Sequence, residues 1–289
     1  MLIQLIINGL INGAIISLVA LGYALVYNTT RIFHIAYSTL YMAAPYFVLT
    51  FFNTLRFNFY VSAIIGILAT ILLSIVIELF IYRPLEIKKS SLNIVMISSI
   101  GVMTVVINLI AMLYGNETKI LNQGLSDTLT VGNIIITKVQ MAQFLISSIL
   151  IFAFFVFLKY TQFGLKTRAL RDDTVLCNVF AVNIPSLRLQ IFALSGFFAA
   201  AGGILVAYDV GMDPYVGMPI LLNAVVALII GGIGKFYAPI VGGFIICVLQ
   251  SLAIYFFSSN WQDAVTFTLL IAFLFLRPQG IFGEKQRTG

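Results

Sequence analysis

Long apolar stretches that carry few charges constrain the fold of this chain most. The first of them, residues 3–27, contains no charged residue at all. A helix that crosses a bilayer needs about 20 consecutive apolar residues. Stretches that reach or approach this length occupy residues 3–27, 36–54, 60–82, 92–114, 139–158, 189–208, 217–234, 237–257 and 264–276. The sequence therefore predicts an all-α, polytopic transmembrane helix bundle with eight or nine spanning helices.

The composition excludes most soluble alternatives. The chain has 289 residues, of which 61% are hydrophobic and 9% are charged, whereas soluble domains are roughly 45–50% apolar and about 25% charged. A soluble enzyme, a nucleic-acid-binding module and a disordered chain are therefore excluded. We expect one transmembrane domain over residues 1–289. Its first helix is retained, because the N-terminus lacks the basic region of a cleaved signal peptide.

The positions of lysine and arginine predict the orientation. When the loop 159–188 is placed in the cytoplasm and the stretches alternate, 13 of the 16 cations lie on the cytoplasmic side, as the positive-inside rule requires. This favours nine crossings, with the N-terminus outside and the C-terminus inside. The stretch 36–54 contains Pro45. If it is a broken or re-entrant helix, eight crossings result and the N-terminus moves inside.

Two polar segments interrupt the apolar pattern. We expect residues 115–138 to form an external loop with a short hairpin around Thr130–Asn133. We expect residues 161–186 to be cytoplasmic, with one helix from Leu165 to Phe180 outside the bilayer. That helix either lies on the membrane surface or docks on a cytoplasmic partner. Its apolar stripe consists of Leu170, Val175, Leu176 and Val179.

A weak internal repeat has an offset of 180 residues: Gly22, Val26 and Ala44 match Gly202, Val206 and Ala224. In each copy a helix leads into an irregular segment, 28–38 or 208–218, and then into another helix. The predicted orientation runs the two copies in opposite directions. The result is an inverted-topology repeat, an arrangement that places a substrate path between its halves.

Irregular backbone at membrane depth must be buried in protein or line a cavity. We therefore take as substrate-path candidates the polar residues and glycine in or near the two irregular segments: His34, Tyr37, Ser38, Thr39, Tyr215, Gly217 and Asn223. Alternatively, His34 is a hydrogen-bonded loop histidine. Asp209 and Asp213 are better explained as marking the external rim.

Several residues are expected to be structural. Glu78 lies about one turn inside a helix end, and we favour a carboxylate that reaches water or pairs with Arg83 or a neighbouring helix over a proton site. A second group consists of glycines that permit a tight turn between closely packed helices. The structural set is Glu78, Arg83, Pro84, Gly231, Gly232, Gly234, Gly242 and Gly243. Phe236 after Lys235 excludes a phosphate-binding loop, which needs serine or threonine there.

No pattern of catalytic or metal-binding residues is present. The single histidine and the isolated Cys177 and Cys247 provide neither a zinc or haem site nor a disulfide framework. We expect no catalytic residue, no metal site and no cofactor in this chain.

A series of short motifs runs nearly end to end along the chain. Each motif alone is permissive, but their order and spacing together are specific to one family. They are Glu78…Tyr82-Arg83-Pro84-Leu85, Ile100-Gly101, Gly164…Arg168-Ala169, Phe192-Ala193-Leu194…Ala200-Ala201-Gly202, Gly231-Gly232-Ile233-Gly234, Gly242-Gly243 and Arg277-Pro278-Gln279-Gly280-Ile281-Phe282-Gly283. With this series the chain resembles the permease subunits of branched-chain amino-acid ABC importers, a group that also includes urea and related permeases.

The resemblance implies a transport subunit, not an enzyme, in a bacterial inner membrane. Its partners would be a second permease in a homo- or heterodimer, two cytoplasmic ABC ATPases that hydrolyse ATP, and an extracellular or periplasmic binding protein that delivers branched-chain or other hydrophobic amino acids. Residues 161–186 then resemble the segment that couples the permease to the ATPase, through Gly164, Arg168, Ala169, Arg171, Asp172 and Asp173.

Two departures from the family pattern bear on the substrate and on the coupling segment. Where the family commonly has Asn-Phe-Ala-His-Gly-Glu before Tyr-Met, this chain has His34-Ile35-Ala36-Tyr37-Ser38-Thr39, and Ala181 replaces a usual glycine. The first departure leaves urea, amides or another small solute open as the substrate. A proton-coupled secondary transporter that uses Glu78 or Asp209 is a competing hypothesis, and so is a gated channel.

Overall fold

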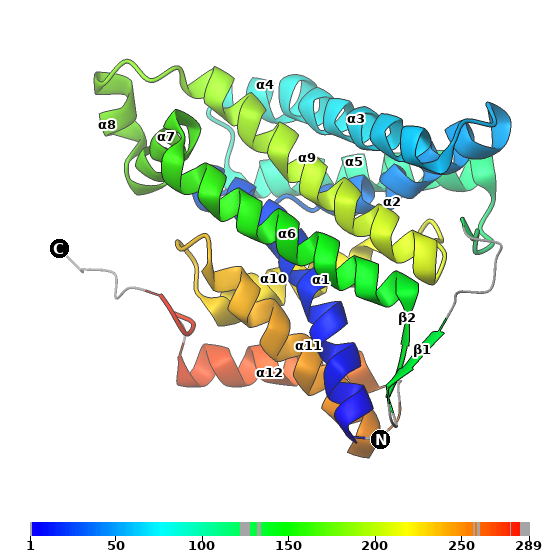
Figure 1. Cartoon of the computed structure of the whole chain (residues 1–289). Coiled ribbons are helices and arrows are strands. Elements are labelled where there is room, and N and C mark those ends of the chain that lie inside the picture. Colours follow the sequence, from blue (N-terminus) through cyan, green and yellow to red (C-terminus); the bar gives the residue numbers. More distant parts are fainter. Residues whose placement is uncertain are drawn as a thin grey trace. The chain divides into compact units, whose positions relative to one another are not determined.

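The computed structural model describes residues 2–121, 128–131, 134–256, 258, 261–277 and 279–283, and nearly all of its elements are helices (Figure 1). Within this part of the chain, six helices are long and apolar enough to cross a membrane. They are α1 (Leu2–Thr30), the continuous helix Phe59–Ile87, α5 (Leu92–Tyr114), α6 (Lys138–Tyr160), α9 (Ile184–Asp209) and α11 (Ala238–Phe256). The prediction of an all-α, multi-pass membrane protein is confirmed at this level.

Three further apolar helices are shorter than a full crossing. They are α2 (Tyr37–Leu49), α10 (Gly217–Gly231) and α12 (Gln262–Leu276). A π-helical turn, η1 (Thr50–Thr54), extends α2. The helix Phe59–Ile87 itself consists of α3 (Phe59–Ile77), a π-helical turn η2 (Glu78–Tyr82) and α4 (Arg83–Ile87).

The chain forms two compact units that are interleaved in sequence. Unit 1 comprises Met1–Ala24, Gln123–Ile151 and Leu222–Gly289, and unit 2 comprises Leu25–Asn122 and Phe152–Leu221. Three helices, α1, α6 and α10, begin in one unit and continue in the other.

In unit 2, α2 packs against both α3 and α9 (Figure 1). Eleven of its 13 residues are buried, so this short apolar helix is surrounded by protein and not by lipid. Its side chains form a core with those of α9, and this core includes Met42, Tyr46, Ala200 and Ile204. Backbone polar groups of an irregular or broken helix are tolerated at membrane depth under such cover.

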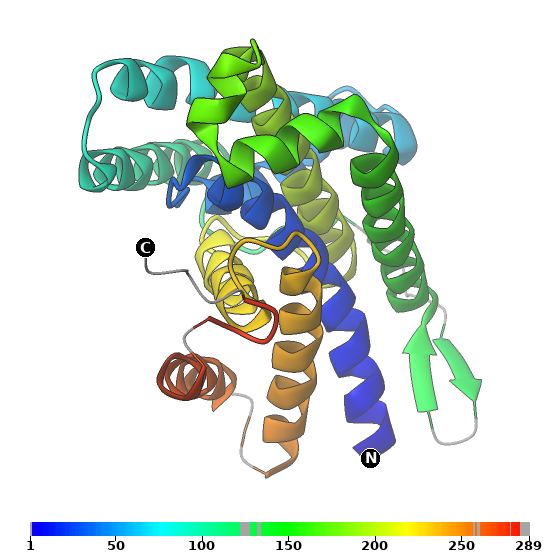
Figure 2. The ribbon, with the colours of Figure 1, turned by 90° about the vertical axis from the view of Figure 1, so that its left-hand side faces the viewer.

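In unit 1, α11 packs against α1 (Figure 2). The Ser17 hydroxyl donates to the carbonyl oxygen of Ile240 at 2.9 Å. The strands β1 (Thr128–Val131) and β2 (Ile134–Thr137) pair antiparallel, with Thr128 opposite Thr137. The predicted hairpin is thus confirmed in its strands, whereas residues 132 and 133 of its turn lie outside the described residues. The Gln4 amide fixes β2 by bonding both backbone groups of Ile135.

The predicted single helix over 165–180 is wrong. The structure has two helices, α7 (Gln162–Asp172) and α8 (Thr174–Val179), separated at Asp173. Asp173 is extended, with φ −155°, and its carboxylate accepts a hydrogen bond from the backbone N–H of Val175 at 2.7 Å. Aspartate side chains compete with the helix for backbone groups in this way, so Asp173 ends one helix and caps the next.

Candidate functional site

The segment between α1 and α2 is held by a buried chain of hydrogen bonds. Nδ1 of His34 lies 2.7 Å from the Tyr82 hydroxyl. That hydroxyl donates to Oγ of Ser99 at 2.7 Å, and the same Oγ accepts the backbone N–H of Ala36 at 2.8 Å. Tyr82 ends the π-helical turn η2, where it and Glu78 are both buried. Such π-turns occur frequently at functional sites. His34, predicted as a path residue or a loop histidine, therefore links three separate parts of unit 2.

Aromatic rings surround His34. Its imidazole lies 5.3–5.9 Å, between ring centroids, from the rings of Tyr82, Phe192 and Tyr37. Its second nitrogen, Nε2, is buried and has no hydrogen-bond partner within the described part of the chain. An unpaired polar atom in such a site costs free energy.

The other candidates at the start of α2 are also buried. The Ser38 hydroxyl donates to the carbonyl oxygen of Ile35 at 2.8 Å, and the Thr39 hydroxyl donates to that of Ala36 at 2.7 Å. Tyr37 is fully buried beside them. The Ser38 and Thr39 hydroxyls thus bond back to the carbonyls at the start of α2, and none of the three residues is open to solvent in this conformation.

The start of α10 meets the start of α2. A Cβ atom placed on Gly217 would overlap the carbonyl oxygen of Ser38, so only glycine permits this approach. The first turns of two short helices therefore lie together in unit 2. Helix N-termini carry partial positive charge and unpaired N–H groups, and in transporters such broken helices meet polar parts of the substrate.

Tyr215 and Asn223 are not part of this junction. Tyr215 is 53% exposed, and its hydroxyl donates to Oδ1 of Asn116 at 3.3 Å. Asn223 belongs to unit 1, where its Oδ1 accepts from Nε2 of Gln250 at 3.1 Å.

The predicted coupling residues separate into two groups. Gly164 and Arg168 face their own chain: a Cβ atom on Gly164 would overlap the carbonyl oxygen of Leu158, and Nη1 of Arg168 donates to that same oxygen. These contacts fold α7 tightly back on the end of α6. Ala169, Asp172 and Asp173 are exposed, and Arg171 pairs with the Asp172 carboxylate.

Several apolar side chains of this segment are exposed. They are Leu165, Val175, Val179 and Phe180, which are 57–78% exposed, and we call them the apolar patch. Leu170, predicted to belong to the apolar stripe, is buried instead. After α8 the chain turns at Ala181, which has φ +52°, and the N–H of Val182 bonds to the carbonyl of Cys177. This is the Schellman end of a helix, where glycine is usual.

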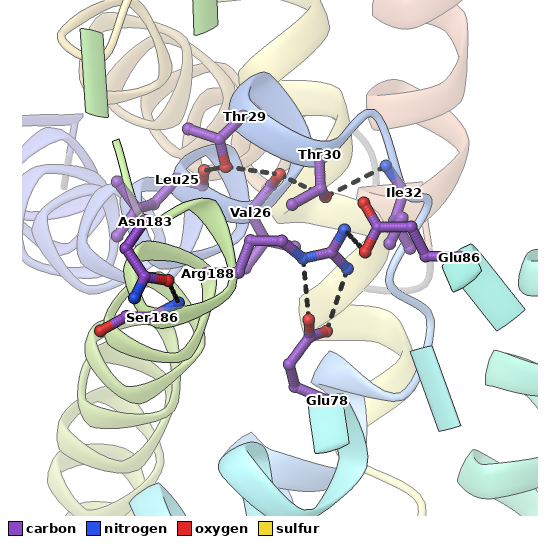
Figure 3. A network of polar contacts seen from close by, with 10 residues as sticks. All are labelled: Leu25, Val26, Thr29, Thr30, Ile32, Glu78, Glu86, Asn183, Ser186 and Arg188. Carbon is purple, nitrogen blue, oxygen red and sulfur yellow. Dashed lines mark hydrogen bonds and ion pairs between the residues drawn. The ribbon is translucent and has the colours of Figure 1, made fainter. Parts of the chain in front are cut away.

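Arg188 was not predicted as a site residue, because its position in the sequence indicated only a loop cation. It lies one turn inside α9 and is buried. Its Nε and Nη2 donate to the two carboxylate oxygens of Glu78 at 2.8 and 3.2 Å, and its Nη1 contacts the Glu86 carboxylate (Figure 3). Asn183 followed by Ile184-Pro185 is a helix-start signal, and it would have placed Arg188 inside the helix.

The other two residues predicted to be structural near Glu78 take no part in the contacts of Arg188 with Glu78 and Glu86. Arg83 is exposed and Pro84 is half-buried.

The predicted structural glycines lie in unit 1. A Cβ atom on Gly231 would overlap the carbonyl of Ala238, and one on Gly242 would overlap that of Ala227. Gly232 and Gly234 have positive φ, and Gly243 lies against Ser17. The C-terminal residues Ile281 and Phe282 bond back to the carbonyls of Ile230 and Gly231. These contacts fix the turn between α10 and α11.

Comparisons with known proteins fit this geometry. A family model described as "Branched-chain amino acid transport system / permease component" matches residues 5–274. Two relatives are each 26% identical over 98% of this chain and 96% of their own length. They are the high-affinity branched-chain amino acid transport system permease proteins LivH of Salmonella typhimurium and BraD of Pseudomonas aeruginosa. A probable branched-chain amino acid transport permease protein, LivH of Methanocaldococcus jannaschii, is 25% identical over 97% of this chain and 92% of its own length.

Proposed function

Because the chain belongs to the family of permease components of branched-chain amino acid transport systems, we propose that it is the membrane subunit of an ATP-binding-cassette importer that translocates branched-chain or other hydrophobic amino acids. The observation that carries this proposal is the extent of the similarity. It runs from α1 to α12 and includes α7 and α8, which lie outside the long apolar helices.

The partners follow from the same family. The chain pairs with a second permease, identical or different, and two cytoplasmic ATPases hydrolyse ATP for the complex. A soluble binding protein delivers the amino acid from outside a bacterial inner membrane. The chain itself carries no catalytic step, and residues 1–289 act as one permease domain that contains both units.

Nine crossings with an inverted repeat account for the order of the helices. Gly217, the first residue of α10, lies 180 positions after Tyr37, the first residue of α2. α11 begins at Ala238, 179 positions after α3 begins at Phe59. The sequence of long helix, irregular segment, short helix and long helix therefore occurs twice at the predicted offset. This supports two halves that cross the membrane in opposite directions, with α2 and α10 as the short helix of each half.

The substrate path passes the junction of these two short helices. Ser99 and Phe192 meet the α1–α2 segment seven and eight residues after their own helices begin, which is roughly 10–12 Å along a helix axis. In the proposed topology this depth would place the junction inside a hydrocarbon core of about 30 Å. His34, Tyr37, Ser38, Thr39 and Gly217 line the path, with Tyr215 on its external side. Because the first four are buried, the path is closed here in this conformation.

The coupling segment transmits the ATPase cycle. The exposed apolar patch docks on the ATPase, and Ala169, Asp172 and Asp173 flank it. Gly164 and Arg168 fix α7 to α6, so that force applied to the patch moves the long helices. The alternative of a proton-coupled transporter needs a titratable Glu78 or Asp209, and the bidentate pairing of Glu78 with Arg188 argues against Glu78 in that role.

Purification of the complex tests this function. The chain is tagged, extracted from its native cells in mild detergent and isolated with whatever proteins remain bound. We expect a pair of P-loop ATPases and a permease to copurify. A variant with Val179→Asp and Phe180→Asp, which disrupts the apolar patch, should lose the ATPases and keep the permease. Isolation of the chain without any ATPase would contradict the proposal.

A further inference from the structure

Arg188 joins two sides of a π-helical turn. Glu78 is the first residue of η2, and Glu86 lies in α4 beyond the end of that turn. The Arg188 guanidinium binds both carboxylates at once (Figure 3). A π-turn is a local interruption of the regular helix and is a place where helices bend. The position of Arg188 therefore sets how the helix Phe59–Ile87 bends at η2.

The same arginine lies directly after the coupling segment. α8 ends at Val179, and only residues 180–183 separate it from α9. The N–H of Val182 bonds back to Cys177, and the side chain of Asn183 caps the N–H of Ser186 at 3.1 Å. This connection is short and bonded at both ends. A displacement of α8 is therefore transmitted to the start of α9, one turn before Arg188.

Beyond η2, hydrogen bonds continue to the start of α2. Tyr82, the last residue of η2, bonds to His34 and to Ser99, and Ser99 bonds to the backbone of Ala36. Ala36 is the N-cap residue of α2. A bend at η2 therefore displaces the Tyr82 hydroxyl, and with it the segment that precedes α2.

Other contacts between α3 and α9 cannot take this role. The Ser74 hydroxyl donates to the carbonyl of Phe192 at 2.7 Å, and Gly196 packs against Ser74. Both lie on the α3 side of η2, so they hold the two helices together without spanning the turn. Arg188 alone, among the described ion pairs, connects residues on both sides of η2.

We propose that Arg188 is a positioning residue for transport: it relays movement of the coupling segment through Glu78, Glu86 and the π-turn η2 to Tyr82, and thereby moves the start of α2. The proposal rests on the proposed function, because it needs an ATPase that moves α7 and α8. It assigns Arg188 and Tyr82 to energy coupling, without contact to the substrate.

The test uses the complete importer, purified as a complex and reconstituted in proteoliposomes with its binding protein and radiolabelled leucine. Uptake and ATP hydrolysis are measured on the same vesicles, and their ratio is the readout. Tyr82→Phe keeps the ring and removes only the hydroxyl of the relay. Arg188→Lys keeps a charge that cannot bind two carboxylates in the planar manner of arginine. Lys88→Gln, an exposed cation of the same helix end, is the control.

We expect uptake per ATP hydrolysed to fall by about 5-fold or more in Tyr82→Phe and Arg188→Lys, the usual lower range of coupling effects, with ATP hydrolysis within about twofold of the unmodified complex. Lys88→Gln should leave the ratio unchanged. Loss of uptake and hydrolysis in equal proportion, or an unchanged ratio in Tyr82→Phe, would overturn the proposal. If the complex with Arg188→Lys does not assemble, the ratio of uptake to ATP hydrolysis in Tyr82→Phe still tests the relay. Absence of ATP-driven uptake in the unmodified complex would instead refute the proposed function.

Discussion

The helix junction and the coupling segment of unit 2 differ in where their side chains bond. At the junction, His34, Ser38 and Thr39 are fully buried and bond to their own chain. In the coupling segment, Val179 and Phe180 are 73% and 78% exposed. The junction is therefore sensitive to any change in shape, whereas the proposed coupling segment presents an exposed apolar surface on which a partner can bind. Mutations at the junction should therefore lower the stability of the fold, whereas mutations in the apolar patch should weaken partner binding.

Removal of the Arg188 charge should have the largest effect on stability. Arg188→Met leaves Glu78 buried without its partner, and breaking a buried ion pair in this way costs about 3–5 kcal/mol. We expect a large loss of folded protein, measured as the melting temperature and monodisperse yield in detergent. Lys88→Met, which removes an exposed cation, should leave both values unchanged. Equal melting temperatures of the two variants would show that the ion pair of Arg188 with Glu78 contributes little to the stability of the fold.

A methyl group at the helix junction should have the next largest effect. Gly217→Ala forces Cβ into the Ser38 carbonyl, and overpacking of this kind costs about 1–3 kcal/mol. Gly101→Ala is the matched control, because a Cβ atom there meets nothing within 4 Å. The junction is correctly described only if Gly217→Ala lowers the melting temperature and Gly101→Ala does not.

Changes in the apolar patch should leave stability intact and remove a partner. Val179→Asp with Phe180→Asp replaces exposed apolar side chains, and exposed substitutions usually change stability by less than about 0.5 kcal/mol. We expect an unaltered melting temperature together with loss of the copurifying ATPases. Leu129→Asp, an exposed position on β1, should retain them. A large drop in stability would mean that the patch packs on the chain itself.

The smallest effect should be a gain in stability. Ala181 has φ +52°, and the left-handed region costs a non-glycine residue about 1–2 kcal/mol. Ala181→Gly relieves this strain, although glycine also gains entropy in the unfolded chain, so we expect an increase below about 1 kcal/mol. Thermal denaturation of the two proteins side by side measures it, and a lower melting temperature for the glycine variant would argue against the observed turn.

The predicted and observed helices agree where the length and composition of an apolar stretch are enough to identify a helix. Apolar stretches of about 20 residues predict helices such as α5 and α11, because burial in lipid requires an uninterrupted helix. The irregular segments that precede Tyr37 and Gly217 also follow from their polar residues. The break at Asp173 was not predicted, since it depends on a side-chain cap that competes with helix propensity.

The buried contacts could not be predicted. Glu78 and Arg188 are 110 positions apart in sequence, and no local pattern reports such a pair. Nor does the sequence indicate that Gly164 packs against the end of α6 and that Arg168 bonds to it, while their neighbours Ala169 and Asp172 are exposed. These assignments depend on helix packing, which periodicity does not resolve when every face of a helix is apolar.

ATP-driven uptake of leucine by proteoliposomes tests the central claim most directly. The vesicles contain the purified complex, ATP is enclosed on the side of the ATPases, and the loaded binding protein is added on the other side. We predict uptake that requires both ATP and the binding protein and that persists when a protonophore collapses the proton gradient. Uptake that follows the proton gradient without ATP, or passive flux through this chain alone, would contradict the account.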